Sequence, residues 1–159
     1  MLRKDSELEW TDKCQQSFDN LKGKLITEPI LSYPDFTRTF YLTTDGSAQG
    51  LGAVLSQKSD EGHERVIAYA SKSLVGAQKQ YGATELECLA VIWAVEHFYS
   101  YLGFKHFILI TDHSALKWLY SSVPKGRLAR WILRLQPYDF EVQHKPGKEN
   151  TNADALSRL

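Results

Sequence analysis

Four acidic residues of this chain lie where a carboxylate would be presented to a ligand. Asp45 ends an apolar, β-rich run and precedes Gly46-Ser47, so its side chain is expected where a strand gives way to a tight turn. The other three are Glu87, Asp112 and Asp154. Mg²⁺ prefers oxygen ligands, and two such ions about 3.5–4 Å apart stabilise the attacking and leaving oxygens of a phosphoryl displacement. The four carboxylates therefore predict a two-metal site suited to phosphodiester cleavage.

The segments around Asp45 and Asp112 explain how two of these carboxylates would meet. Asp112 follows a second buried-type run over 107–111, and the apolar stretch between the two runs predicts a buried crossover helix over 84–102. If the two strands are parallel neighbours, Asp45 and Asp112 leave the sheet at the same edge. Ligand sites of open α/β sheets favour that edge. Glu87 lies near the start of the crossover stretch.

The rest of the pattern has strands first and then alternating helices and strands, which indicates a mixed sheet with an antiparallel meander and parallel additions. At 159 residues and 43% hydrophobic, the chain can bury one core. The expected elements are helices over 11–25, 84–102, 114–120, 126–135 and 151–159, and strands over 39–45, 51–58, 66–71, 106–111 and 138–143.

Short segments around the acidic residues occur in the order typical of one protein family. They cover residues 42–47 with 50–57, then 85–91, then 111–116, and finally 153–158. Through these segments the chain resembles the ribonuclease H region of reverse transcriptases from gypsy-like LTR retrotransposons. The resemblance covers most of residues 38–159, and residues 1–37 resemble the end of the preceding polymerase part.

The resemblance implies an α/β fold of the ribonuclease H type, with a mixed five-stranded sheet, helices on both faces and an N-terminal helical extension. Residues 1–37 would be a remnant of the polymerase or connection region, and residues 38–159 the ribonuclease H domain. The implied activity is endonucleolytic cleavage of the RNA strand of RNA/DNA hybrids, leaving 5′-phosphate and 3′-hydroxyl ends. The implied cofactors are two Mg²⁺ ions, with Mn²⁺ as a substitute.

The family pattern also implies a role for each carboxylate. Asp45 would bridge both ions, Asp154 would serve the ion that holds the attacking water, and Glu87 and Asp112 would serve the ion near the leaving oxygen. The implied partners are the hybrid, an upstream polymerase domain and a downstream integrase of the parent polyprotein. The implied location is intracellular, in a cytoplasmic virus-like particle or the nucleus.

Three of the four carboxylates also have a purely structural interpretation. Asp45 suits a turn before Gly46, Asp112 suits a helix cap, and Asp154 suits the positive end of a short helix. Four such coincidences in family order are much rarer than one shared site. If the four do converge, their mutual repulsion predicts that at least one has a raised pKa in the absence of metal.

The glutamate of the site has a competitor in the sequence. Glu87 lies three residues after Thr84, so the segment 84–87 fits a helix-capping box, and Glu85 is then the alternative functional glutamate. We favour Glu87 because it directly precedes the apolar segment 88–91, as the family's glutamate precedes its buried helix.

A histidine near the C-terminus is a further candidate. His144 begins a stretch whose Pro146 and Gly147 predict a mobile loop between a strand and the terminal helix. Cellular ribonucleases H keep a histidine in this loop, so the resemblance implies a proton shuttle or an aid to product release. A solvent-exposed loop histidine without a catalytic role is the equal alternative.

The charge distribution indicates where nucleic acid would be held. Formal net charge is zero, but residues 117–148 carry seven Lys or Arg against two acidic residues, a local balance of +5. Arg130 and Arg134 equally suit an ordinary solvated helix face. No room exists between 120 and 126 for the extra basic helix of some cellular relatives, so affinity should be weak. The candidate contact residues are Ser47, Gln49, Arg130, Arg134, Lys145, Asn150 and Asn152.

Other features exclude some function classes. Cys14 and Cys88 lack metal-ligand spacing, which favours small core residues in a reducing compartment. No apolar run approaches the roughly 20 residues of a membrane span, and the first residues show no charged-then-apolar signal pattern, so a soluble intracellular protein is expected. Two alternatives to an enzyme remain open: a noncatalytic binding module and a host-adopted fragment that serves protein interaction.

Overall fold

The computed structural model describes residues 10–25, 31–112, 126–146 and 150–158. The chain divides into two compact units, Met1–Ser32 and Tyr33–Leu159. The first unit contains α1 (Asp12–Leu25), and the backbone nitrogen of Cys14 donates to the Thr11 hydroxyl at 3.4 Å, as in a helix N-cap. The boundary predicted after residue 37 stays a prediction.

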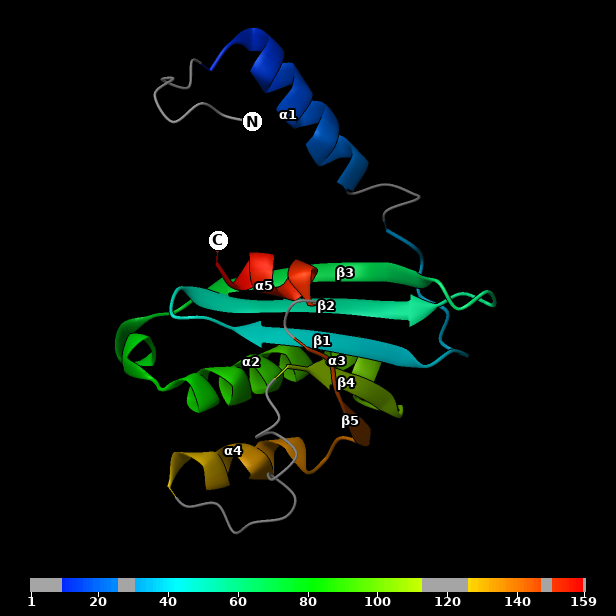
Figure 1. Cartoon of the computed structure of the whole chain (residues 1–159). Helices are drawn as coiled ribbons and strands as arrows, with labels where there is room; N and C mark the ends of the chain where they lie inside the picture. Colours follow the sequence, from blue (N-terminus) through cyan, green and yellow to red (C-terminus); the bar gives the residue numbers. More distant parts are fainter. Residues whose placement is uncertain (1–9, 26–30, 113–125, 147–149, 159) are drawn as a thin grey trace. The chain divides into compact units, whose positions relative to one another are not determined.

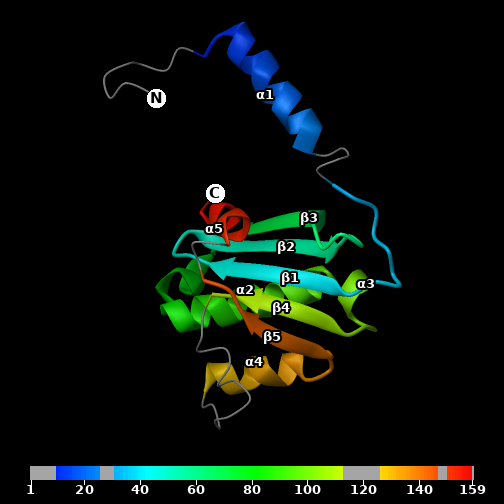
Figure 2. The ribbon, with the colours of Figure 1, turned by 45° about the vertical axis from the view of Figure 1, so that its right-hand side comes forward.

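The second unit is built on one mixed sheet of five strands in the order β3-β2-β1-β4-β5 (Figure 2). The strands β1 (Phe40–Gly46), β2 (Gly50–Lys58) and β3 (Glu64–Ser73) form the predicted antiparallel meander. The strand β4 (Phe107–Thr111) pairs in parallel with β1, and β5 (Phe140–His144) pairs in parallel with β4. The predicted mixed sheet is confirmed.

Successive side chains of β1 point alternately to the core and to the opposite face of the sheet. Phe40 and Leu42 are fully buried in the same cluster as Val91 and Val95 of α2 (Ala83–His97). Since successive side chains of a strand point to opposite faces, Asp45 lies on the other face from Phe40 and Leu42. Asp45 pairs with Gly52 of β2 in the register of the sheet.

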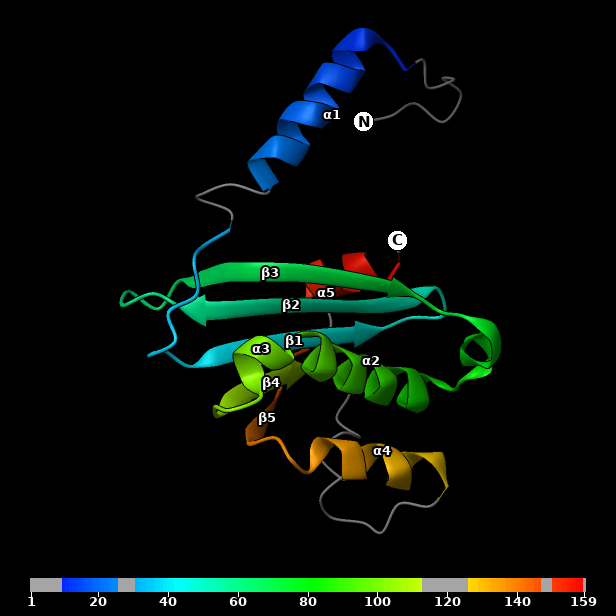
Figure 3. The same ribbon diagram turned by 180° about the vertical axis from the view of Figure 1, so that it is seen from behind.

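Helices cover both faces of the sheet, as predicted. Figure 3 shows α2 and α3 (Tyr99–Leu102) against one face, and Figure 1 shows α5 (Thr151–Ser157) on the other. The helix α4 (Arg127–Leu135) packs on α2 through buried Trp131 and Leu135. A short 3₁₀ helix, η1 (Gly76–Gln80), connects β3 to α2.

The helical region after β3 differs from the prediction. The single helix predicted over 84–102 is wrong, because the chain leaves helical geometry at Phe98, with φ −95° and ψ 23°, before α3 begins. Phe98 is buried and is neither Gly nor Pro, so the break does not lie at a helix-breaking residue. The helix predicted over 114–120 lies outside the described residues.

A glycine allows α5 to approach the sheet closely. A Cβ atom on Gly52 would stand 2.2 Å from the carbonyl oxygen of Ala153, a distance that real Cβ atoms do not adopt. A side chain at this position would therefore push α5 off β2. This contact brings the C-terminal helix to the strand partner of Asp45.

Candidate metal centre

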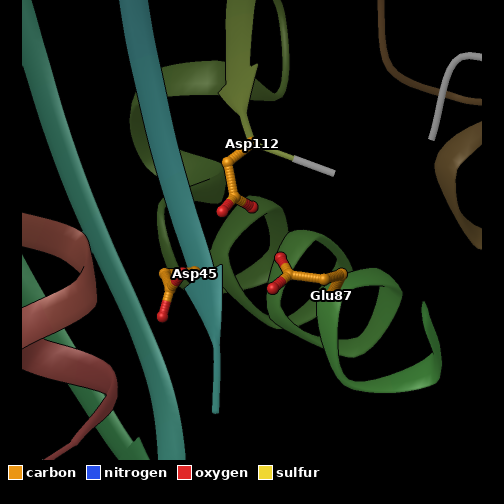
Figure 4. Close-up of side chains that lie close together, drawn as sticks. All are labelled: Asp45, Glu87 and Asp112. Atoms are coloured by element: carbon orange, nitrogen blue, oxygen red, sulfur yellow. The ribbon is translucent and has the colours of Figure 1, made fainter. Parts of the chain in front are cut away.

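Three of the predicted carboxylates converge at one edge of the sheet. Asp45 comes from the end of β1, Glu87 from the first half of α2, and Asp112 directly follows β4 (Figure 4). Each offers an oxygen, and these oxygens all lie within 4.8 Å of one another. The parallel pairing of β1 with β4 accounts for the meeting of the two aspartates.

The glutamate reaches this edge because Gly46 lets α2 approach β1. A Cβ atom on Gly46 would stand 2.6 Å from the carbonyl oxygen of Leu86. The backbone nitrogen of Gly46 donates to Glu87 Oε1 at 3.3 Å. The glycine that follows the aspartate is thus required for the close approach that places Glu87 beside Asp45.

Burial and mutual repulsion perturb the acids as expected. Burial raises the pKa of Asp45, the hydrogen bond from Ser157 opposes that rise, and the charges of Asp154 and Asp112 add to it. Burial first, and then the charges of Asp45 and Asp112, raise the pKa of Glu87 to about 8. Protonation of Glu87 near neutral pH is one way to relieve the repulsion, and a bound cation is the other.

Glu87 also carries an orphaned acceptor. Its Oε2 is buried and has no hydrogen-bond partner within the described part of the chain. A buried carboxylate oxygen without a partner is costly, and a cation bound at that position would remove the cost. The donor set, all carboxylate oxygens, suits a hard cation such as Mg²⁺.

The two competing glutamates have different roles. Glu85 Oε2 accepts from the backbone nitrogen of Gly82 at 3.1 Å, and its Oε1 forms a 2.8 Å ion pair with Arg127 of α4. The capping interaction therefore uses Gly82 and Glu85, and the capping box predicted from Thr84 and Glu87 is wrong. The choice of Glu87 over Glu85 for the cluster agrees with the geometry.

Asp154 lies outside the cluster of three. It occupies the first turn of α5, where Arg158 holds its Oδ1 through Nε at 2.9 Å and Nη2 at 2.5 Å. Its charge nevertheless raises the pKa of Asp45, so the two carboxylates lie within electrostatic range. Three of the four predicted acids are brought together, and the fourth is neutralised by an arginine one helical turn away.

Comparison with known proteins now identifies the family. Residues 10–109 match the family model of the RNase H-like domain found in reverse transcriptase. The chain belongs to this family. It is 44% identical over 160 residues to the Pol polyprotein of transposon 412 from Drosophila melanogaster, covering all of this chain and 13% of the polyprotein. It is 38% identical over 164 residues to the transposon Tf2-3 polyprotein of Schizosaccharomyces pombe, covering 12% of it.

These relatives are gypsy-like retrotransposon polyproteins, and the chain spans only about an eighth of their length. Solved structures show the fold. The RNase H1 of the archaeon Halobacterium salinarum NRC-1 superposes with a TM-score of 0.57 at 22% identity over 74% of this chain and 93% of its own. LC11-RNase H1, solved in complex with an RNA/DNA hybrid, superposes with a TM-score of 0.56 at 16% identity, covering 74% and 93%.

His144 of this RNase H-like domain is placed differently from the prediction. It is the last residue of β5 and not part of a loop, because the parallel pairing with β4 extends to Thr111 and His144. Its Nε2 lies 2.9 Å from the carbonyl oxygen of Asp112 and donates to it. The ring is exposed and sits beside the cluster, and its chemical role stays a prediction.

The predicted contact residues fall into two groups. Exposed to solvent are Gln49, Arg130 and Asn152, and in the described residues Arg130 forms no ion pair. The side chains of Ser47, Arg134 and Asn150 have partners within the protein. Ser47 donates to the Ser157 carbonyl at 2.6 Å, and Arg134 pairs with Glu96 at 2.6 Å.

The remaining two candidates lie near α5. Asn150 is buried, and its Nδ2 donates to the Lys145 carbonyl oxygen at 3.3 Å. Lys145, Asn150 and Asn152 line a small polar cavity of about 30 Å³. Contact of any of these residues with nucleic acid stays a prediction.

Residues that the sequence analysis did not single out also touch the site. Ser157 Oγ lies 2.5 Å from Asp45 Oδ2, and Arg158 pairs with Asp154. Their spacing of three and four residues from Asp154 is the signal that points to them, because such spacings share one helix face. No helix in the described parts of the chain is long and apolar enough to cross a membrane.

Proposed function

We propose that this domain is a divalent-metal-dependent endonuclease that hydrolyses the RNA strand of RNA/DNA hybrids. One observation carries the proposal: three carboxylates converge within 4.8 Å at the edge of a ribonuclease H fold. Two of them, Asp45 and Glu87, are buried to 8% and 7% exposure. Buried acids held this close together are costly unless cations neutralise them.

The residues fit two cations. Asp45, Glu87 and Asp112 would hold one ion, and Asp154 together with Asp45 would hold the second, with Mg²⁺ the expected ion and Mn²⁺ a substitute. When bound, such ions activate a water and stabilise charge on the attacking and leaving oxygens of a phosphoryl displacement. Hydrolysis by this route leaves 5′-phosphate and 3′-hydroxyl ends.

The chain's own groups position the reaction. Burial of Asp45 and Glu87 excludes bulk water from one side of the site, and their fixed backbones keep the carboxylates aimed at one point. His144 Nδ1 is left as an acceptor when Nε2 donates to Asp112, so this exposed nitrogen could take or release a proton beside the scissile phosphate.

The ligand of one fold neighbour supports the proposed substrate class. LC11-RNase H1 was solved with an RNA/DNA hybrid, which supports hybrid as the ligand of this fold. Selectivity for the RNA strand would rest on 2′-hydroxyl contacts in the minor groove. With zero formal net charge, the domain would make few phosphate contacts and bind weakly by itself.

The relatives supply the context of the proposal. They are Pol polyproteins, so we propose that the domain works beside an upstream polymerase and a downstream integrase during reverse transcription. A cytoplasmic virus-like particle or the nucleus is the corresponding location.

The test is cleavage of an RNA/DNA hybrid labelled on either strand, with Mg²⁺, Mn²⁺ or EDTA, beside single-stranded RNA and duplex DNA. We expect cleavage of the hybrid's RNA strand alone, ending in 5′-phosphates, and none in EDTA. Glu85→Gln serves as a matched control, because this glutamate lies two residues from Glu87 but outside the cluster. Cleavage of the DNA strand, or equal cleavage in EDTA, would refute the proposal. Cation binding without any cleavage would favour a noncatalytic binding module.

A further inference from the structure

The last turn of α5 touches the carboxylate that the proposed function places between both cations. Ser157 is fully buried, and its hydroxyl lies 2.5 Å from Asp45 Oδ2. The same hydroxyl lies 2.9 Å from the carbonyl oxygen of Asp154, one turn earlier in the helix. A hydroxyl has one proton to donate, and an ionised carboxylate is the stronger acceptor, so the proton goes to Asp45.

The helix that carries Ser157 is fastened to the sheet at several points. Ser47, in the turn after β1, donates to the Ser157 carbonyl oxygen at 2.6 Å. Ser71 of β3 donates to the Leu156 carbonyl oxygen at 2.7 Å. The absence of a side chain at Gly52 lets α5 lie directly on β2. The Ser157 hydroxyl is therefore held by the fold, and Asp45 must adapt to it.

We infer that Ser157 is a positioning residue of the metal centre, which acts by fixing the plane of the Asp45 carboxylate. A bond to one oxygen of a carboxylate sets the direction of the other, because both lie in one rigid plane. Without this bond, Asp45 would be free to turn away from Glu87 and Asp112, whose charges repel it. This inference rests on the proposed metal site and adds to it a residue that contacts neither cation nor substrate.

The bond also couples α5 to the other side of the site. Asp154 belongs to the same helix turn, since Ser157 follows it by three residues. The hydroxyl that fixes Asp45 therefore also sets how far Asp154 stands from it. Outer residues that orient metal ligands typically change metal affinity about 10–100-fold when they are removed.

The experiment measures Mg²⁺ affinity by calorimetry in variants of the full chain. Ser157→Ala removes the hydroxyl, Ser157→Cys removes it while filling its space, and Ser157→Thr retains it. The matched control is Ser71→Ala, which removes another hydrogen bond that fastens α5 but lies away from the carboxylates. Thermal melts in EDTA report the fold of each variant.

We expect Ser157→Ala and Ser157→Cys to weaken Mg²⁺ binding by about tenfold or more. Ser157→Thr should restore most of the affinity. Ser71→Ala keeps the Ser157 hydroxyl and the bond from Ser47, so it should lower the melting temperature but reduce the affinity far less than the two hydroxyl-free variants do. On hybrid, the two hydroxyl-free variants should lose turnover at saturating substrate while KM for hybrid stays near the wild-type value.

Two results would overturn the inference alone: wild-type Mg²⁺ affinity in both hydroxyl-free variants, or an equal loss of affinity in Ser71→Ala, which would show a merely structural role. A wild-type chain that binds no Mg²⁺ at millimolar concentration would overturn the metal site and this inference together. A wild-type chain that binds Mg²⁺ but cuts no hybrid would refute the proposed activity and leave the affinity comparison valid.

Discussion

The two sides of the metal centre are built differently. On one side, Asp45 and Glu87 are buried, and the sheet and Gly46 hold their backbones in place. On the other side, Asp154 and its partner Arg158 keep 41% and 63% of their side-chain surface exposed, and they form an i,i+4 pair on a short helix. On the buried side, the carboxylates repel one another, and a bound cation would relieve this repulsion. On the exposed side, Arg158 already neutralises Asp154.

The difference separates the part of the centre that depends on burial from the part that depends on an exposed ion pair. Desolvation raises the pKa of both buried acids, so their ionisation depends on the fold and on bound cations. An exposed ion pair contributes little, with a typical value of about 0–1 kcal/mol, so Asp154 can exchange Arg158 for another cation at small cost. The buried side is preorganised, and the α5 side is adjustable.

The largest effect is expected from Asp45→Asn. This change keeps the volume of the side chain but removes the ligand proposed to be shared by both ions, so hybrid cleavage should fall by roughly 10³-fold or more. Cleavage rates under excess Mg²⁺ and melting curves in EDTA would check the loss of activity against an intact fold. Wild-type cleavage by this variant would show that the buried side of the centre is not the catalytic one.

The two glutamates should separate catalysis from stability. Glu87→Gln should abolish most cleavage, because Glu87 belongs to the cluster. Glu85→Gln should leave cleavage near wild type but cost less than about 1 kcal/mol of folding free energy, because glutamine can still accept from Gly82 but loses the partly exposed ion pair with Arg127. A cleavage assay would measure the rate of each variant, and chemical denaturation would measure its folding free energy. Equal rates would mean that the assignment of the glutamate is wrong.

The buried side should also make stability depend on pH when metal is removed. Glu87 has a pKa of about 8 in the folded protein against an ordinary value of 4.5, so the folded state holds this proton more tightly than the unfolded state. Its contribution is fully present below pH 4.5 and is lost as pH rises from 4.5 to 8. The loss should be on the order of a few kcal/mol.

Denaturation in EDTA at several pH values would measure this loss. Glu87→Gln should flatten the dependence and be more stable than wild type at pH 8, and Mg²⁺ should stabilise wild type there more than the variant. An unchanged slope in the variant would place the titrating group elsewhere.

A smaller effect is expected on the α5 side. Arg158→Gln should lower the folding free energy by less than about 1 kcal/mol, because the pair is exposed. It should tighten binding of the second cation several-fold, since Asp154 no longer has a competing guanidinium. Mn²⁺ titration by calorimetry would check the change, with Asp154→Asn as the variant that should lose that site. Weaker cation binding in Arg158→Gln would show that the arginine supports the site.

The smallest effects should come from the arginines of α4. Arg130 is exposed, so Arg130→Glu should weaken hybrid binding slightly at low salt without changing stability. Arg134→Glu should in addition cost stability, because it places a second negative charge beside Glu96. Hybrid affinity across a salt series would distinguish the two. Unchanged affinity and salt slope in both variants would assign these arginines to an ordinary solvated face.

Much of this architecture could be predicted from the sequence, because residues close together in the chain determine it. Alternating apolar residues predict β1 and its neighbours, and the glycines after Asp45 predict the turn at which the strand ends. The parallel pairing of β1 with β4 follows from the crossover helix between them, so the meeting of Asp45 with Asp112 could be predicted without coordinates. The choice of Glu87 over Glu85 rested on the family pattern.

Other features depend on contacts between residues far apart in the chain. Phe98, where the helix breaks, is buried in the core cluster, and Glu85 forms an ion pair with an arginine 42 residues away. His144 belongs to β5 because β4 offers it a partner strand. The sequence alone determined which acids are present and which strand ends carry them. Only the tertiary structure decided that the Ser157 hydroxyl reaches Asp45, because this bond depends on the exact approach of α5 to the sheet, whereas the pair of Asp154 with Arg158 lies four residues apart in one segment.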